Sequence, residues 1–375
     1  MKKILLVATV QSHIAQFHKP LINWLHEQGY VVDVAARNNL AEKKNLHLDE
    51  PDNIHNIPFS RSPFSPKNLK AYKKLKKLIL EGEYDLVHCN TPVGGILTRM
   101  AANKLRKKEK ITVLYEAHGF HFFHGGSKKN WLIWYPIEKH FSKKTDVLVT
   151  INKMDYELAK KKFKAKRVER IPGVGLNLSQ FMSVGEASNI KEELGLNDNH
   201  HIVLSVGELN KNKNHQVIIK AIAHLQDENI HYVIAGNGPL KEELETLAKK
   251  LGVEGQVHFL GYRRDIPQLF KSADLLAFPS MREGLGMASI EAMSAGLPLV
   301  TSDRHGINDY SENGKTGFKY NPNDYAGFAE GIKTIVYNDD LKKQIGEYNA
   351  NLAKDYTVDV SMEKLGEIYN QALRK

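Results

Sequence analysis

The chain alternates short apolar, β-branched runs with amphipathic stretches along almost its whole length. The apolar runs cover residues 3–10, 30–36, 84–90, 111–117, 145–152, 201–207, 231–238, 257–261, 274–280 and 298–303. Helical periodicity is clearest over residues 67–80, 214–225 and 240–251, and in the first of these it places Leu69, Tyr72, Leu75 and Ile79 on one face. Runs that are apolar throughout, separated by amphipathic helices, indicate parallel strands covered on both faces. The pattern therefore predicts an α/β protein with doubly wound parallel sheets.

The alternation lapses at residues 171–190, which are rich in Gly, Ser and Asn, and a new strand–helix series starts near residue 201. We place a domain boundary near residue 180, between two Rossmann-like halves of about equal size. The last stretch, residues 358–375, has the pattern of an amphipathic helix. Because open α/β sheets bind ligands beyond the carboxyl ends of their strands, we look for chemistry in the loops there.

The first apolar run follows two lysines and could be the core of a signal peptide. It ends after about seven residues without a small-residue cleavage site, so we interpret it as a buried strand. No window holds enough consecutive apolar residues to span a bilayer. The one cysteine, Cys89, excludes a disulfide framework and a multi-cysteine metal site, and it fits a reducing compartment.

The net charge of +10 is unevenly distributed. Residues 1–180 carry 32 Lys/Arg and 16 Asp/Glu, whereas the remainder carries 21 and 27. This asymmetry favours a polyanionic or membrane-surface partner for the first half. Trp131, Trp134 and Tyr135 are either anchors at a membrane interface or packing residues of a helix. Nucleic acid is not expected as a partner, because no nucleic-acid-binding motif accompanies the basic residues.

The stretch "REGLGMASIEAMSAG" holds two glutamates on either side of a glycine turn. It follows a predicted strand, and the helix that begins in it stops near Gly296. A helix N-terminus offers free N–H groups, and glycines allow close approach, so a diphosphate could bind here. Glu283 and Glu291 would then bind sugar and ribose hydroxyls. The alternative is that Glu283 is a solvated loop residue and Glu291 an acid favoured by the helix dipole.

Two further loops follow strands in the second half. "VGELNKNKN" carries Lys211 and Lys213, either of which could neutralise a phosphate or simply be solvated. "IAGNGPLKEEL" has glycines around Asn237 but lacks the dinucleotide-binding spacing, and the first strand is not followed by a glycine fingerprint. These observations disfavour a nicotinamide or flavin enzyme.

In the first half, "YEAHGFHFFHGG" places His118, His121 and His124 three residues apart. The spacing invites a zinc interpretation, but no carboxylate accompanies the histidines at a regular spacing. We expect His118 to point into the binding site, and His121 and His124 to pack and hydrogen bond within the loop.

Taken together, these motifs resemble those of retaining family 4 glycosyltransferases, which have the GT-B fold. "PSMREGLGMASIEAMSAGLPLV" looks like the E-x7-E signature of that family, and "SVGELNKNKNH", "IAGNGPLKEEL", "LGYRRDIPQLFKSADLLAFPS" and "SENGKTGFKY" follow in family order. "EAHGFHFFHGG" and "VHCNTPVGGILTRMAA" resemble bacterial capsular and exopolysaccharide enzymes. One departure is Glu208, where the family usually has arginine.

The resemblance implies roles for the matched positions. Glu283 binds the donor sugar, Lys213 the diphosphate and Glu291 the ribose, while His118 lies near the anomeric carbon. The other donor-site positions are Gly207, Asn237, Tyr262, Arg263, Gly284, Leu285, Gly286 and Met287. Thr9 and His13 close the site from the acceptor side. The implied domains are residues 1–180 for the acceptor, 181–355 for the nucleotide-sugar and 356–375 as a helix crossing back, with the two sheets facing each other across a cleft.

The implied activity is transfer of a sugar, with retention, from a nucleotide-sugar, by family frequency a UDP-sugar, to a lipid-linked saccharide in capsule or exopolysaccharide biosynthesis. The helix N-terminus and Lys213 would meet the charge that develops on the leaving diphosphate, so neither a metal nor another cofactor is expected. The basic half would hold the enzyme at the inner face of the plasma membrane, in the cytoplasm. The alternatives are a non-catalytic nucleotide-sugar-binding subunit, suggested by Glu208, and a sugar-nucleotide epimerase with the same fold.

Overall fold

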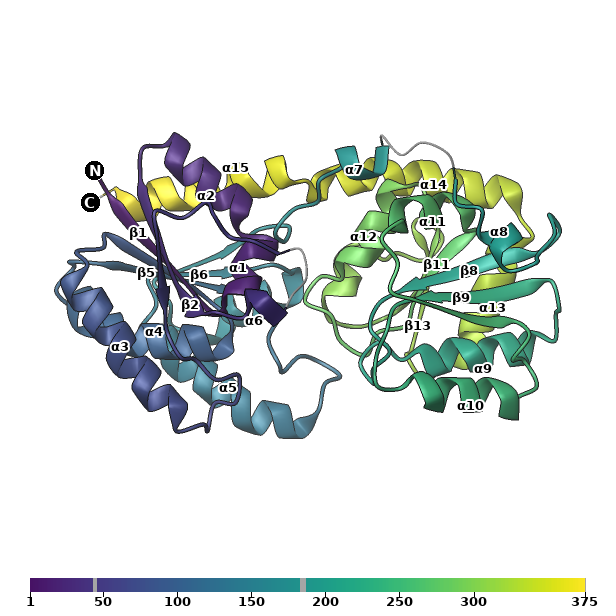
Figure 1. Ribbon diagram of the computed structural model, residues 1–375, viewed down its shortest axis with the longest axis horizontal. Helices are drawn as coiled ribbons and strands as arrows, with labels where there is room; N and C mark the ends of the chain where they lie inside the picture. The colour runs from purple at the N-terminus through teal and green to yellow at the C-terminus, as the bar shows by residue number, and fades with distance from the viewer. Residues whose placement is uncertain (43–45, 183–186, 375) are drawn as a thin grey trace. The chain divides into compact units, whose positions relative to one another are not determined.

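The computed structural model describes residues 1–42, 46–182 and 187–374, and the chain forms two compact units (Figure 1). Unit 1 comprises Met1–Gly175 and Val358–Lys375, and unit 2 comprises Leu176–Thr357. Each unit is built around one parallel sheet with helices on both faces. The predicted class, two doubly wound α/β domains, is confirmed.

Unit 1 has a seven-stranded sheet in the order β3-β2-β1-β4-β5-β6-β7. Its strands are β1 (Lys3–Val10), β2 (Val31–Arg37), β3 (Asn53–Asn56), β4 (Leu86–Asn90), β5 (Thr112–Ala117), β6 (Val147–Thr150) and β7 (Arg167–Arg170). Its helices are α1 (Gln11–Phe17), α2 (Lys19–Glu27), α3 (Lys67–Glu81), α4 (Pro92–Arg106), α5 (Lys128–Ser142), α6 (Lys153–Lys162) and α15 (Val358–Leu373). The strand at the start of the chain, β1, is central and buried, as expected of a core strand.

The residues of β4 show how the two faces of this sheet differ. Val87 and Cys89 point into the apolar core beneath α3 and α4, because side chains alternate along a strand. His88, between them, points to the opposite face, where its Nδ1 lies 2.8 Å from the hydroxyl of Tyr369 on α15. The last helix thus packs on unit 1, beside α2 (Figure 1).

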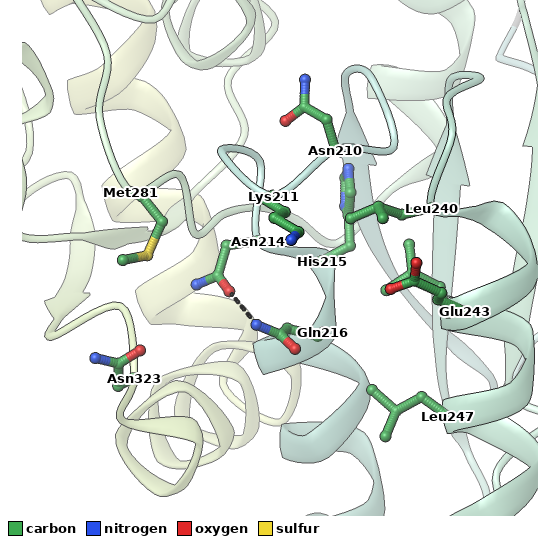
Figure 2. Close-up of a pocket in the computed structure, with 11 residues that line it drawn as sticks. Asn210, Lys211, Asn214, His215, Gln216, Leu240, Glu243, Leu247, Met281 and Asn323 are labelled. Carbon is green, nitrogen blue, oxygen red and sulfur yellow. Dashed lines mark hydrogen bonds between the residues drawn. The ribbon is translucent and has the colours of Figure 1, made fainter. Parts of the chain in front are cut away.

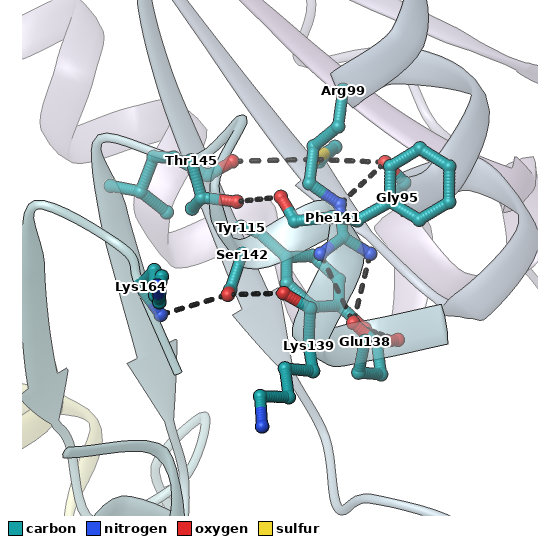
Figure 3. Close-up of polar contacts among 11 residues, drawn as sticks. Gly95, Arg99, Tyr115, Glu138, Lys139, Phe141, Ser142, Thr145 and Lys164 are labelled. Carbon is teal, nitrogen blue, oxygen red and sulfur yellow. Dashed lines mark hydrogen bonds and ion pairs between the residues drawn. The ribbon is translucent and has the colours of Figure 1, made fainter. Parts of the chain in front are cut away.

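A buried ion pair fixes the helices on the α4 side of this sheet (Figure 3). Both terminal nitrogens of Arg99 lie 3.0 Å from Oε2 of Glu138, and Tyr115 donates its hydroxyl hydrogen to Oε1 of Glu138. Arg99 also donates from Nε to the carbonyl of Gly95 and lies over the Tyr115 ring. The charges are therefore paired and hydrogen bonded, which a fully buried guanidinium requires.

Unit 2 has a six-stranded sheet in the order β10-β9-β8-β11-β12-β13. Its strands are β8 (His201–Val206), β9 (Ile230–Ala235), β10 (Val257–Gly261), β11 (Leu275–Phe278), β12 (Leu299–Ser302) and β13 (Gly317–Tyr320). Its helices are α7 (Ser179–Met182), α8 (Ile190–Glu193), α9 (His215–Leu225), α10 (Lys241–Lys250), α11 (Ile266–Ser272), α12 (Met287–Ser294), α13 (Tyr325–Val336) and α14 (Asp339–Leu352). α9, α10 and α13 cover one face, and α11, α12 and α14 lie on the other (Figure 1).

The surface of unit 1 differs from the sequence prediction at α3 and decides between the two interpretations of the aromatic residues on α5. The periodicity placed Leu69 on the apolar face of the 67–80 helix, but its side chain is 62% exposed, whereas Leu75 and Ile79 are fully buried. Trp131, Trp134 and Tyr135 pack against the unit 1 core, and Trp131 donates its ring N–H to the carbonyl of Phe123, so these aromatics are packing residues of α5. None of the helices in the described part of the chain has the length and hydropathy needed to cross a membrane.

Candidate active site

The loops after β8 and β11 lie together at the carboxyl edge of the unit 2 sheet, because these two strands are paired. Main-chain and side-chain hydrogen bonds join the loops. Met281 donates its N–H to the carbonyl of Asn212 at 2.7 Å, and the Asn212 amide donates to the carbonyl of Arg282 at 2.9 Å. Asn214 reaches the carbonyl of Pro279. The two predicted ligand loops therefore form one bonded platform.

Lys213 is the charged centre of this platform. Its Nζ lies 2.8 Å from Oε1 of Glu283 and 4.7 Å from the centroid of the Phe278 ring. A Cβ at Gly207 would come within 3.1 Å of the Lys213 side chain, so the glycine leaves room for the lysine to cross the loop. Lys213 and Glu283 are both mostly buried, so their attraction is less screened than that of a surface pair.

The start of α12 forms one side of the same region. Gly286 precedes the helix with φ +90°, and a Cβ there would come within 2.8 Å of the Phe278 ring. Leu285 is buried, Gly284 precedes it in the loop, and Met287 is the first helical residue. Among the residues that the structure describes, no side chain caps this helix. Its N-terminus therefore retains the capacity to bind an anion through N–H groups and the helix dipole.

Glu291 lies in the second turn of α12 and is mostly buried. Burial raises the pKa of its carboxyl, and the positive charge of Lys213 partly offsets that increase. Lys213 thus acts electrostatically on both glutamates, through a direct ion pair with Glu283 and through its field at Glu291. Three of the predicted donor-binding residues, Lys213, Glu283 and Glu291, therefore lie together in unit 2.

The other predicted donor-site residues follow β9 and β10. The carbonyl of Asn237 accepts the N–H of Leu209 at 3.0 Å, which ties the β9 loop to the loop containing Gly207. Tyr262 is 73% exposed, and the Arg263 guanidinium is paired with Asp265 and Glu193 at 2.6 and 2.7 Å. These two ion pairs raise the pKa of Arg263 and occupy its side chain, so only its backbone is offered to a ligand.

Glu208 and Lys211, next to the platform, have other surroundings. Oε2 of Glu208 accepts a hydrogen bond from the Asn210 amide at 2.9 Å. Lys211 lies in the wall of a pocket of about 380 Å³ between the β8 loop, α9 and α10 (Figure 2). The pocket is lined by Asn210, Lys211, Asn214, His215, Gln216, Leu240, Glu243, Leu244, Leu247, Met281 and Asn323. It was not foreseen from the sequence, and of the two lysines considered for a phosphate it contains Lys211 but not Lys213.

The predicted residues of unit 1 lie at the carboxyl edge of its sheet. His118 Nε2 is 3.0 Å from Oδ1 of Asn90, and its ring meets the edge of the His13 ring at 4.8 Å between centroids. Thr9, at the end of β1, shares a 2.7 Å hydrogen bond with the hydroxyl of Thr91. His121 stacks on Trp134, so the evenly spaced histidines do not converge and His121 packs as expected.

A buried carboxylate, Glu116, joins His118 to two histidines that the sequence did not single out. Its Oε1 lies 3.3 Å from His118 Nε2, and its Oε2 lies 3.2 Å from His88 Nε2 and 4.0 Å from His18 Nε2. We call Glu116 and the imidazoles of His13, His18, His88 and His118 the histidine cluster. The signal for it was present, because His88 and Glu116 are charged or polar residues inside otherwise apolar strands.

Burial affects the protonation of three imidazoles of the histidine cluster. It lowers the pKa of His13 and His118, and that of His18 to about 3, so these imidazoles are neutral near pH 7. Burial alone would raise the pKa of Glu116, but interaction with His118 and His88 holds it well below its usual range. The ionised carboxylate of Glu116 thus lies within ion-pair distance of the His88 and His118 rings.

The geometry of the histidine cluster also bears on metal binding. The donor atoms of His13, His18 and His118 lie within 4.8 Å of one another, as do those of His18, His88 and Glu116. Nitrogen and carboxylate ligands of this kind suit zinc. However, His18 Nε2 and His118 Nε2 are 3.1 and 3.0 Å from Oδ1 of Asn90, so both nitrogens already have a hydrogen-bond partner.

Comparison with known proteins defines the class. Residues 3–152 match the family described as "Glycosyl transferase 4-like", and residues 186–352 match "Glycosyl transferases group 1". The chain therefore belongs to the group 1, family 4-like glycosyltransferases. It is 39% identical over 98% of its length to EpsD of Bacillus subtilis (strain 168), by name a glycosyltransferase, and covers 96% of that protein.

Two further similarities are informative. The chain is 27% identical, over 81% of its length and 79% of the relative, to the Escherichia coli UDP-Gal:alpha-D-GlcNAc-diphosphoundecaprenol alpha-1,3-galactosyltransferase. Among solved structures, Anabaena Alr3699/HepE in complex with UDP and glucose matches 99% of this chain and 100% of its own, with a TM-score of 0.76 and 19% identity. The latter likeness establishes the GT-B fold.

Proposed function

We propose that this glycosyltransferase moves a sugar from a UDP-sugar to a lipid-linked saccharide, with retention and without a metal, in exopolysaccharide or capsule biosynthesis. The observation that carries the proposal is the Lys213–Glu283 ion pair beside the start of α12, with Glu291 within the field of Lys213. The two carboxylates suit the hydroxyls of a sugar and a ribose. The cation and the helix N-terminus suit a diphosphate. The complex of Alr3699/HepE with UDP and glucose supports the choice of donor.

On the donor side, Lys213 and the N–H groups from Gly284 to Met287 bind the diphosphate. Glu283 accepts hydrogen bonds from sugar hydroxyls, and Glu291 accepts them from the ribose. Gly207 and Asn237 shape the floor, and the backbone of Tyr262 and Arg263 borders the base. As the sugar–phosphate bond breaks, negative charge develops on the leaving diphosphate, and Lys213 and the helix dipole stabilise it.

On the acceptor side, the incoming hydroxyl attacks the anomeric carbon from the face that the diphosphate leaves. The oxygen–hydrogen bond of the acceptor breaks, and its proton passes to the departing diphosphate. Because attack and departure take place on the same face, the anomeric configuration is retained. His118 borders the donor sugar, held by Asn90 and Glu116, and Thr9 and His13 line the acceptor side. Exclusion of water by the bound substrates prevents hydrolysis.

The acceptor class is supported by the name of the E. coli relative, whose substrate is a diphosphoundecaprenol-linked saccharide. The excess of Lys and Arg in residues 1–180 suits an anionic membrane surface, so we place the enzyme in the cytoplasm at the inner face of the plasma membrane.

The test is a transfer assay with UDP-, GDP- and ADP-sugars and a polyprenyl-diphosphate-linked saccharide, with the product anomer read by NMR. We expect an elongated lipid-linked product that retains the donor configuration and is not formed by Lys213→Met. Donor isomerisation without an acceptor would indicate an epimerase. Donor binding without turnover would indicate a non-catalytic subunit, the alternative that Glu208 suggested.

A further inference from the structure

Unit 1 contains a strongly basic pocket whose residues have no role in the reaction as described above. It has a volume of about 560 Å³ and lies where Arg37 ends β2 and the loop after β3 leads into α3. Four cationic side chains line it, those of Arg37, Arg61, Lys67 and Lys70. None of the described residues that line this basic pocket carries a carboxylate. The pocket therefore concentrates positive charge.

The placement of these charges is unfavourable in the absence of an anion. Lys67 and Lys70 lie in the first turn of α3, where the helix dipole is positive, and that turn has no acidic residue. Cations at this end of a helix are destabilising, and four like charges around one hollow repel one another. Arg37 Nη1 lies 3.8 Å from Oε1 of the exposed residue Glu42. An anionic ligand would relieve both effects.

The backbone around the basic pocket is already ordered. The buried side chain of Asn68 accepts the N–H of Ser60 at 2.9 Å and donates to the carbonyl of Ser62 at 2.8 Å. These two hydrogen bonds fix the loop against the start of α3, so Arg61, Lys67 and Lys70 are presented without the entropic cost of ordering a loop on binding.

Two exposed apolar side chains belong to the same segment. Phe64 is 85% exposed and Leu69 is 62% exposed. Large apolar side chains beside a cluster of cations are typical of surfaces that enter the interface of a bilayer, where the apolar groups contact acyl chains and the cations contact phosphate. This combination favours a phosphate carried by a lipid over a phosphate free in solution.

We propose that the basic pocket binds the diphosphate of the membrane-embedded lipid acceptor, with Phe64 and Leu69 inserted into the adjacent leaflet. This inference rests on the lipid-linked acceptor of the proposed function. The carboxyl ends of β2 and β3 lie at the same edge of the parallel sheet as those of β1 and β5, which carry Thr9 and lead to His118. A diphosphate held at the β2–β3 end would leave the attached saccharide free to extend along this edge.

The test is flotation of the full-length protein with phosphatidylcholine vesicles that contain polyprenyl diphosphate, polyprenyl monophosphate, phosphatidylglycerol or no addition. The Arg61→Gln/Lys70→Gln variant removes two pocket charges. Lys161→Gln/Lys162→Gln, on exposed residues of α6, removes the same charge elsewhere. We expect the pocket variant to lose more than about tenfold in affinity for the diphosphate vesicles, as for lost charge-assisted hydrogen bonds, and the control to lose much less.

Three outcomes would overturn the proposal. Equal losses in the two variants would show that only overall charge matters, and equal binding to phosphatidylglycerol and polyprenyl diphosphate would show a general anionic surface. Displacement from the vesicles by soluble inorganic pyrophosphate at a concentration no higher than that of the lipid diphosphate would show a site for free phosphate. Phe64→Ser should weaken vesicle binding without changing the melting temperature, and an unchanged affinity would remove the insertion step.

The failure of the proposed function is separable from the failure of this site. If the enzyme binds diphosphate vesicles through the basic pocket but transfers no sugar to any lipid acceptor, the site stands and the proposed reaction falls. If transfer occurs, the pocket variant should raise KM for the lipid acceptor about tenfold or more while its melting-temperature shift with UDP-sugar stays that of wild type. If the pocket variant transfers sugar with an unchanged KM for the lipid acceptor, the proposed role of the pocket is wrong, but the proposed reaction is not.

Discussion

Nζ of Lys213 lies 2.8 Å from Oε1 of Glu283, so the cation assigned to the donor diphosphate and the acid assigned to the donor sugar are bonded before a donor arrives. The pair holds the lysine across Gly207 and beside the Phe278 ring. In the proposed reaction, a donor phosphate would meet a cation already in position, and a sugar hydroxyl would meet an oriented carboxylate.

Lys213→Met should lower kcat by about 100- to 1,000-fold, because removal of one preorganised electrostatic group from a transition state has this effect. Steady-state transfer kinetics measure it. Lys211→Met is the matched control, since Lys211 lines the pocket of Figure 2 and should leave kcat within about twofold of wild type by the same reasoning. Equal losses in the two variants would contradict the assignment to Lys213.

Glu291 should make donor binding depend on pH. Burial raises the pKa of its carboxyl, so the ionised form, which accepts the ribose hydrogen bonds, is lost at a higher pH than for an exposed glutamate. The donor KM of the wild type should therefore rise as the pH falls through this raised value. Glu291→Gln should have a KM about 10- to 100-fold higher at neutral pH, with that acid limb absent. If the donor KM of Glu291→Gln still rose at low pH as in the wild type, the pH dependence would belong to another group.

Glu116 should act on the reaction through His118. Its charge raises the pKa of that imidazole against the effect of burial, so Glu116→Gln should shift the His118 limb of the kcat/KM profile to lower pH. Loss of the charged neighbour of His118 should also reduce kcat by about 10- to 100-fold. A lower melting temperature with the pH profile unmoved would show that Glu116 supports only the fold.

The Arg99–Glu138 pair should matter for stability rather than for catalysis. Arg99→Met leaves the Glu138 carboxylate buried without its partner, which costs about 3–5 kcal/mol in the free energy of unfolding. Arg99→Met/Glu138→Leu removes both charges and should recover much of that loss. Urea unfolding followed by the fluorescence of Trp131 and Trp134 on α5 reports on this unit. A double variant no more stable than the single one would contradict the pairing argument.

Transfer should be insensitive to chelation, since Lys213 and the α12 N-terminus supply the charge that a metal would otherwise provide. Dialysis against EDTA should leave kcat unchanged, and the protein should contain less than one equivalent of zinc by elemental analysis. If dialysis removed activity, and added zinc restored it in the wild type but not in His18→Ala, the histidine cluster would instead be a metal centre.

The sequence predicted the central strands and the edge strand β10, and it missed the edge strands β3, β7 and β13. β1 and β8 read as continuous apolar runs because both faces of a central parallel strand are covered. β3 and β7 are sheet edges with sequences Asn-Ile-His-Asn and Arg-Val-Glu-Arg, so they lack the apolar run that marks a strand. Leu69 matched the helical period, but α3 buries only the side that faces the sheet.

The loops to which we assign donor binding could be located from the sequence because each follows a recognisable strand and uses glycine and charge at short spacing. The histidine cluster was only hinted at by the polar residues His88 and Glu116 inside apolar strands, since His18, His88 and Glu116 come from three separate segments that meet through the pairing of β1, β4 and β5. We placed the domain boundary near residue 180, whereas in the structure the first segment of unit 1 ends at Gly175. A lapse in periodicity marks a linker but not the residue at which contacts change units.

The most direct test of the account is a thermal-shift panel of UDP-, GDP- and ADP-sugars on the wild type, Lys213→Met and Glu291→Gln. A ligand at one hundred times its dissociation constant stabilises by about 2.7 kcal/mol. The account predicts a raised melting temperature with UDP-sugars, reduced in both variants. A wild type that no nucleotide-sugar stabilises, or variants that respond as fully as the wild type, would contradict a donor site built on Lys213, Glu283 and Glu291.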